Sequence, residues 1–181
     1  DRLARLSVAA QPRPELDLYA RLDYGDTDLV GSPFEFVPAG GRPRFTKSTD
    51  DRLAPERDDS RSLDGMVQAD WREGGHTVTG IVARTTFRYS NAINIQARSP
   101  TRLVVENAED FRQDSLELRW LSPAGEPLEW VLGVYGDRAR TELPARSSTD
   151  FPLPPGSPDG VTERHYLERT QSASLFGQLT W

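Results

Sequence analysis

Apolar and polar residues alternate in seven stretches of the chain, and these stretches lie between the prolines. In the clearest of them, Glu15–Tyr24, every even position from Leu16 to Tyr24 is apolar and the odd positions are mostly charged. Side chains of a strand point alternately to two faces, so this period of two predicts strands with one apolar face. The predicted strands are Arg2–Ala10, Glu15–Tyr24, Asp64–Arg72, His76–Tyr89, Arg112–Ser122, Leu128–Arg138 and Ser172–Trp181.

The links between these strands are alternately short and long. The short ones carry the proline and glycine of tight turns, whereas each long one exceeds the usual length of a loop in a compact domain. In chain order the links are Gln11–Pro14, Gly25–Leu63, Glu73–Gly75, Ser90–Phe111, Pro123–Pro127 and Ala139–Gln171. Short turns at one end of a meander and long loops at the other are typical of outer-membrane β-barrels. Two apolar-poor stretches, Asp50–Arg61 and Asn107–Gln113, are expected to hold short helical turns at most.

Aromatic and charged side chains extend this pattern. Membrane barrels carry aromatic girdles on the apolar outer face and polar residues on the inner face. The aromatic residues expected near strand ends, mostly on the apolar face, are Trp71, Trp120, Trp130, Trp181, Tyr24, Phe87 and Tyr89. The charged residues expected to point into a lumen, and to pair there or face a plug, are Arg5, Asp17, Arg21, Arg72, Glu117 and Arg119. One-sided amphipathic strands also occur in soluble β-sandwiches, which remain the alternative.

Composition removes several other classes. Only 36% of the residues are hydrophobic, and no run of about 18 apolar residues could form a membrane-spanning helix. The formal net charge of −6 argues against nucleic acid as a partner, because phosphate contacts need clustered cations. The absence of cysteine excludes a disulfide framework and thiolate chemistry.

Motifs for catalysis or cofactor binding are missing. The sequence has no GxSxG, no phosphate-binding P-loop and no HExxH. Its only histidines, His76 and His165, are too far apart in sequence to favour a shared metal site, and Gly40-Gly41 fits a loop turn. The acidic set Glu106, Glu109 and Asp110 could bind calcium, but a solvated loop is the preferred interpretation. We therefore expect no enzyme activity, no cofactor, and no catalytic or metal-binding residue, and we assign no substrate ligand.

Several segments resemble TonB-dependent outer-membrane receptors, and they occur in that family's order. Ser115–Pro123 followed by Leu128–Tyr135 resembles a hairpin in which a Gln-Glu-Leu-Arg-Leu-like strand ends in Ser-Pro and precedes a Trp-x-x-Gly-x-aromatic strand. Ser172–Trp181 resembles the family's Phe-Gly-Gln-x-Thr-aromatic strand, and Gly74–Ala83 and Glu15–Tyr24 resemble earlier strands. The chain departs from the family at Ser115-Leu116, where Ser-Gln is usual, and at Arg84-Thr85, which replaces an aromatic-Arg pair.

The resemblance implies that residues 1–181 are an internal piece of a larger transmembrane barrel of roughly 22 strands. The expected fold is all-β, a partial antiparallel barrel meander of about seven strands, without the plug domain, the TonB box and the last strands. The implied function is TonB-dependent uptake of a scarce solute, such as an iron–siderophore complex, through the outer membrane of a Gram-negative cell. Outer loops would capture the ligand, and the plug would then rearrange.

The partners that the resemblance implies are the lipid bilayer, the plug domain of the same full-length chain, the TonB complex and a small-molecule ligand. Two hypotheses of other classes remain open. One is a soluble β-sandwich binding module, such as a carbohydrate-binding domain. The other is a small complete barrel of eight strands with an adhesive or structural role.

Overall fold

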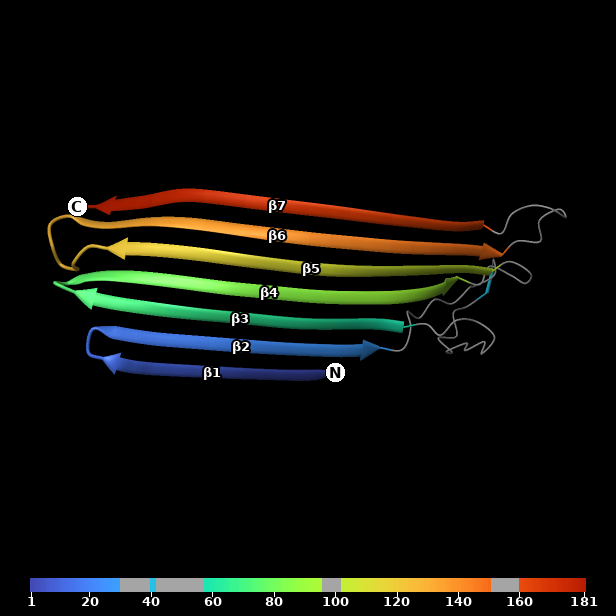
Figure 1. The fold of residues 1–181 in the computed structure, drawn as a ribbon, viewed down its shortest axis with the longest axis horizontal. Coiled ribbons are helices and arrows are strands. Elements are labelled where there is room, and N and C mark those ends of the chain that lie inside the picture. Colours follow the sequence, from blue (N-terminus) through green and yellow to red (C-terminus); the bar gives the residue numbers. More distant parts are fainter. Residues whose placement is uncertain (30–39, 42–56, 96–101, 151–159) are drawn as a thin grey trace.

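Seven antiparallel strands form one sheet in which each strand pairs with its neighbours in chain order (Figure 1). The structure is a computed structural model, and it describes residues 1–29, 40–41, 57–95, 102–150 and 160–181. The strands are β1 (Arg2–Arg13), β2 (Leu16–Leu29), β3 (Arg57–Glu73), β4 (His76–Ile95), β5 (Arg102–Leu121), β6 (Glu129–Asp150) and β7 (Gly160–Thr180). The predicted all-β meander of seven strands is confirmed.

The three short links lie together at one end of the strands, which we call the turn end (Figure 1). The β3–β4 turn contains Gly74 and Gly75, both with positive φ, a conformation that only glycine adopts without strain. A Cβ on Gly75 would stand 3.0 Å from the ring of Pro123, so this glycine also lets two neighbouring turns approach each other. We call the opposite end of the strands, where the three long links begin and end, the loop end.

The strands are mostly longer than the sequence predicted, and most of the extra length lies towards the loop end. Both ends of the first predicted long link and most of the other two are strand, and Asn107–Gln113, expected to hold helical turns, lies inside β5. Of the other expected helical stretch, residues 57–61 belong to β3 and residues 50–56 lie outside the described part of the chain. In the loop-end half both faces of the sheet carry polar residues, so the alternation that marks a strand disappears from the sequence.

Proline within a strand was a second source of error. Pro144 pairs in register with His165 of β7 inside β6, although proline was taken to end strands. On its other side the β5–β6 register is interrupted between Asn107 and Asp110. Because proline has no N–H to donate, a break in one neighbouring ladder accommodates it. Pro12 lies likewise at a register shift within the edge strand β1.

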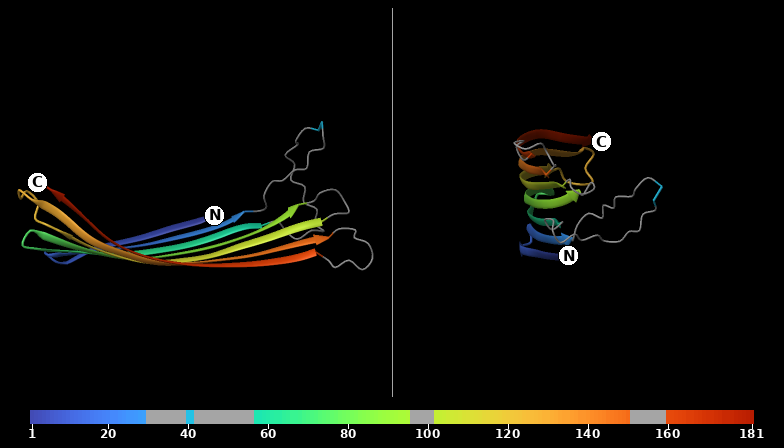
Figure 2. Two further views of the ribbon diagram at one scale, coloured as in Figure 1. Left: turned by 90° about the horizontal axis from the view of Figure 1, so that it is seen from above. Right: turned by 90° about the vertical axis from the view of Figure 1, so that its right-hand side faces the viewer.

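The sheet is a single curved layer, as Figure 2 shows, and it has no packed core of its own. Among the described residues only Thr79, Ala92, Val104 and Gly133 are buried. The described strands therefore do not form the two packed sheets of a sandwich, and their large apolar side chains are exposed. Such a sheet depends on partners at its faces and edges, because a layer without a core buries too little apolar surface to fold alone.

Pairing in register assigns each side chain to one of two faces. We call the face that carries Leu18, Val67 and Leu118 the belt face. The opposite face carries the residues that alternate with them, and we call it the polar face. The prediction that Phe87 and Tyr89 share the apolar face with the tryptophans was wrong, because Phe87 pairs across the polar face with Ser62 and Phe111. The phase of β4 was ambiguous in the sequence, since both of its faces carry apolar residues.

Candidate functional site

A contiguous band of apolar side chains crosses all seven strands on the belt face, next to the turn end. We call this band the apolar belt. Its large side chains are 37–81% exposed. Soluble monomers rarely expose an apolar patch larger than a few hundred Å². The belt comprises Leu6, Val8, Leu18, Leu22, Leu63, Val67, Trp71, Val82, Leu116, Leu118, Trp120, Leu132, Val134, Leu175 and Leu179.

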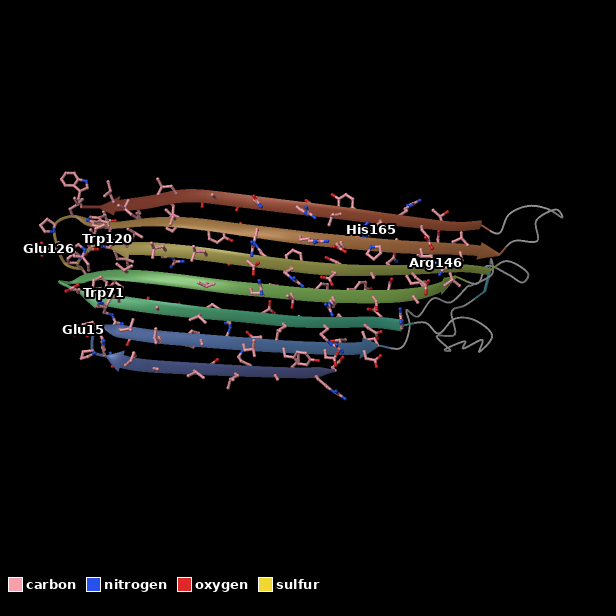
Figure 3. The ribbon with its side chains drawn as sticks, viewed as in Figure 1. Glu15, Trp71, Trp120, Glu126, Arg146 and His165 are labelled. Atoms are coloured by element: carbon pink, nitrogen blue, oxygen red, sulfur yellow. The ribbon has the colours of Figure 1, made fainter. Side chains whose placement is uncertain are left out.

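Tryptophans border the belt at the turn end, as Figure 3 shows for Trp71 and Trp120. The rings of Trp120 and Trp130 meet edge to face with centroids 5.1 Å apart. His76 lies against both rings, at 5.9 and 6.0 Å, and its Nδ1 is 3.3 Å from the carbonyl oxygen of Leu121. Tryptophan combines a large apolar ring with an N–H donor, so it suits a boundary between apolar and wet surroundings.

The belt runs obliquely across the strands. On β3 the first charged residue of the belt face towards the loop end is Arg61, which lies opposite Arg88 of β4. On β4 charge begins at Arg84, four residues nearer to the turns, which is about 13 Å along the strand. The turn-side edge shifts in the same direction, from Leu16 on β2 to Trp181 after β7. Leu16 lies in the row of Gly177, so this edge shifts by four residues, about 13 Å, between β2 and β7. Over those five strand spacings, about 24 Å, the shift corresponds to strands that lean by about 28° relative to the belt.

The polar face carries the six charged residues that were predicted to share one face, and all six form ion pairs there. Arg5 and Arg21 both pair with Asp23, and Arg72 pairs with Asp17 of the neighbouring strand. Glu117 and Arg119 pair with each other along β5. Their shared face and mutual pairing agree with the prediction.

Hydrogen bonds from neutral donors to an aspartate, and one tight aromatic contact, complete the polar face. Thr79 Oγ1 donates to Asp70 at 2.5 Å, and Gln68 Nε2 donates to the same carboxylate at 2.8 Å. In the same row, beyond Arg119 on β5, the ring of Phe176 on β7 covers Gly133 on β6. A Cβ at position 133 would lie only 2.2 Å from that ring. The glycine therefore provides the space in which the aromatic side chain lies flat on the sheet.

No family model matches the chain, and no curated protein is significantly similar to it. No helix among the described residues is long and apolar enough to cross a membrane.

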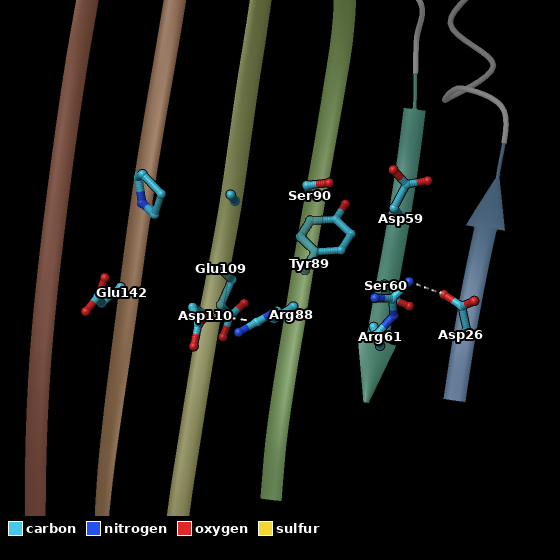
Figure 4. Close-up of a pocket in the computed structure, with 12 residues that line it drawn as sticks. Asp26, Asp59, Ser60, Arg61, Arg88, Tyr89, Ser90, Glu109, Asp110 and Glu142 are labelled. Carbon is cyan, nitrogen blue, oxygen red and sulfur yellow. Dashed lines mark hydrogen bonds and ion pairs between the residues drawn. The ribbon is translucent and has the colours of Figure 1, made fainter. Parts of the chain in front are cut away.

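A shallow hollow of about 360 Å³ lies near the loop end (Figure 4). Two ion pairs cross its lining, Arg61 with Asp26 at 3.5 Å and Arg88 with Asp110 at 3.1 Å. Burial, together with the Asp58 carboxylate, raises the pKa of Tyr89 above its ordinary value. Register places Tyr89 and Arg88 on opposite faces, so one ligand could not contact the whole lining from one side. The hollow is a surface depression, and we assign it no substrate.

The metal sites considered from the sequence do not assemble. His76 lies at the turn end, whereas His165 lies in the row of Ser90, fourteen residues away along the strand, or about 46 Å. Within β5, register puts Glu106 and Asp110 on the belt face and Glu109 on the polar face. Across the described ranges no group of three or more histidine, aspartate and glutamate side chains could hold a metal ion.

Sequence reasoning missed one set of charged residues. Five arginines, Arg84, Arg112, Arg138, Arg140 and Arg169, lie together on the belt face where the apolar belt ends. Arg140 and Arg169 were assigned to a long loop, and the sequence indicated no register for any of the five. The Arg138-Ala-Arg140 spacing was the available signal, because residues two apart share a face of a strand.

Proposed function

We propose that this chain is part of the wall of a β-barrel in the outer membrane of a Gram-negative cell. The observation that carries the proposal is the exposed apolar belt on one face of a meander whose other face is polar. Lipid is the partner that satisfies this arrangement, because membrane barrels alternate apolar-out and polar-in along each strand. Orientation follows from the links, with short turns towards the periplasm and long loops outside.

The dimensions of the belt support this proposal. On β3 the belt extends from Leu63 to Trp71, about 27 Å along the strand. With a lean of about 28° this corresponds to about 24 Å along the membrane normal, close to the apolar band of about 25 Å of outer-membrane barrels. The oblique course of the belt is the geometry expected of tilted strands, and tryptophans mark its periplasmic edge.

Unpaired edges give further support. Among the strands that the structure describes, β1 and β7 each have a neighbour on one side only. Inside a bilayer no water is present to satisfy the free N–H and C=O groups of such an edge, so membrane-spanning sheets close into barrels. We infer that other strands of the same barrel pair with β1 and β7.

The full-length protein is proposed to be a TonB-dependent receptor that imports a scarce solute such as an iron–siderophore complex. The ordered resemblance of five strand segments to that family supports this step. In this mechanism the polar face lines the lumen, where paired charges such as Arg72 and Asp17 form a wall beside the plug. Solute capture belongs to the outer loops, and the energy for plug movement comes from the inner membrane. In this mechanism the described residues form part of the barrel wall.

Two measurements test the proposal with the full-length gene product. The protein should fractionate with outer membranes and migrate faster on SDS gels before heating than after, as folded barrels do. Deleting the gene should abolish energy-dependent uptake of the labelled solute, and an uncoupler of the proton gradient should mimic the deletion. Recovery in the soluble fraction would overturn the membrane assignment. Membrane location with unchanged uptake of every tested iron–siderophore complex would overturn the iron–siderophore assignment alone.

A further inference from the structure

Two rows of arginine border the apolar belt at its loop-side edge, on the belt face. In the first row Arg84 and Arg138 flank Asp114 across β4, β5 and β6. In the second row Arg112, Arg140 and Arg169 stand side by side across β5, β6 and β7. We call these five residues the arginine rows. They place five cations and one carboxylate next to the belt.

The positive charge of the arginine rows is only partly compensated. Asp114 accepts hydrogen bonds from Arg84 at 2.5 Å and Arg138 at 3.1 Å, so one carboxylate is shared by two guanidinium groups. Arg140 pairs with Glu142. Among the described residues no ion pair involves Arg112 or Arg169. Like charges directly opposite each other in a sheet are destabilising, so three arginines in register favour an external anion.

The excess of positive charge is confined to the edge of the belt. On β4, β5 and β6 the next row towards the loop end consists of Arg88, Asp110 and Glu142, so acid outnumbers base there. Across the whole sheet this row is balanced, because Arg2 and Arg61 offset Asp26 on the first three strands. Binding of soluble anions would not require the arginines to lie at the edge of the apolar belt. Binding of an anion that is itself held at the boundary of an apolar phase would require this.

We propose that the arginine rows bind the phosphate groups of anionic lipid headgroups in the outer leaflet. This inference rests on the proposed membrane location of the belt. Acyl chains would cover the belt, and the phosphate of the same lipid would then reach the level of Arg112 and Arg169, both of which are exposed. Guanidinium groups suit this ligand because their planar fork donates two parallel hydrogen bonds to phosphate oxygens.

The experiment compares lipid selectivity in the full-length protein and two double variants. The test variant is Arg112→Gln with Arg169→Gln. The control is Arg5→Gln with Arg21→Gln, which removes the same charge from the polar face. Native mass spectrometry of protein exposed to equal amounts of phosphatidylglycerol and phosphatidylcholine gives the ratio of bound lipids. A basic residue near a membrane surface strengthens binding about fivefold, so the test variant should lose roughly 25-fold in this ratio and the control little.

The outcomes separate this inference from the proposed function. A folded protein that inserts into vesicles but shows no preference for phosphatidylglycerol overturns the lipid site alone. Equal losses in the two variants would also overturn it, because net charge and not the arginine rows would then set the preference. If inorganic phosphate displaces phosphatidylglycerol more effectively than chloride at equal ionic strength, the site takes free phosphate and not a lipid. A protein that fails to insert overturns both proposals.

Discussion

Replacing Leu175 with arginine tests whether lipid covers the apolar belt. Leu175 lies on the belt face of β7 and is 81% exposed in the sheet. If water covered this face, an exposed substitution would change the free energy of unfolding by less than about 0.5 kcal/mol. If lipid covers it, arginine near the bilayer midplane should destabilise the barrel by about 2–4 kcal/mol. The two environments therefore predict results that differ by several times the usual experimental error.

Gln171→Arg is the matched control for this substitution. Gln171 lies on the same face of the same strand, four residues nearer to the loop end, in the row of Arg138. Arginine near the interface costs about 0–1 kcal/mol, so the two variants should differ by at least about 1 kcal/mol. The assay is urea unfolding of the full-length protein in phospholipid vesicles, followed by the heat-dependent shift on SDS gels. Equal stability of Leu175→Arg and wild type would refute the lipid-facing belt, and so would equal losses in both variants.

Two further predictions concern single contacts. Gly133→Ala should destabilise the sheet by about 1 kcal/mol, at the low end of the range for overpacking, because the Phe176 ring is partly exposed and can turn away. Adding Phe176→Leu should recover part of that loss in a double-mutant cycle, whereas additive losses would exclude the contact. Outside the belt, the Arg84 hydrogen bond holds the pKa of Asp114 below its usual value. A lowered pKa stabilises the folded state only while the carboxylate is ionised. The difference in urea midpoint between wild type and Asp114→Asn should therefore stay constant down to about pH 4 and shrink in stronger acid.

The turn-end half of the fold was predictable because there one face is apolar and the other is not. Alternation around Leu18 and Leu118 located the strands, and glycine or proline located the turns. Further along the same strands this contrast vanishes, so Asn107–Gln113 resembles a loop in sequence although it pairs on both sides in β5. Pro144 was wrongly taken to end a strand for a related reason. The missing N–H of proline excludes it from a strand only where the neighbouring strand needs that hydrogen-bond donor.

Sequence alone determined the local facts of this protein: seven strands, their turns, and a polar face whose charges were assigned correctly. These follow from the period of two, which is a property of each strand by itself. Only the tertiary structure decided what depends on register. Pairing placed Phe87 with the polar residues, set the oblique course of the apolar belt, and brought Arg112, Arg140 and Arg169 from three strands into one row. Backbone hydrogen bonds between strands fix that alignment, and no single strand contains the information.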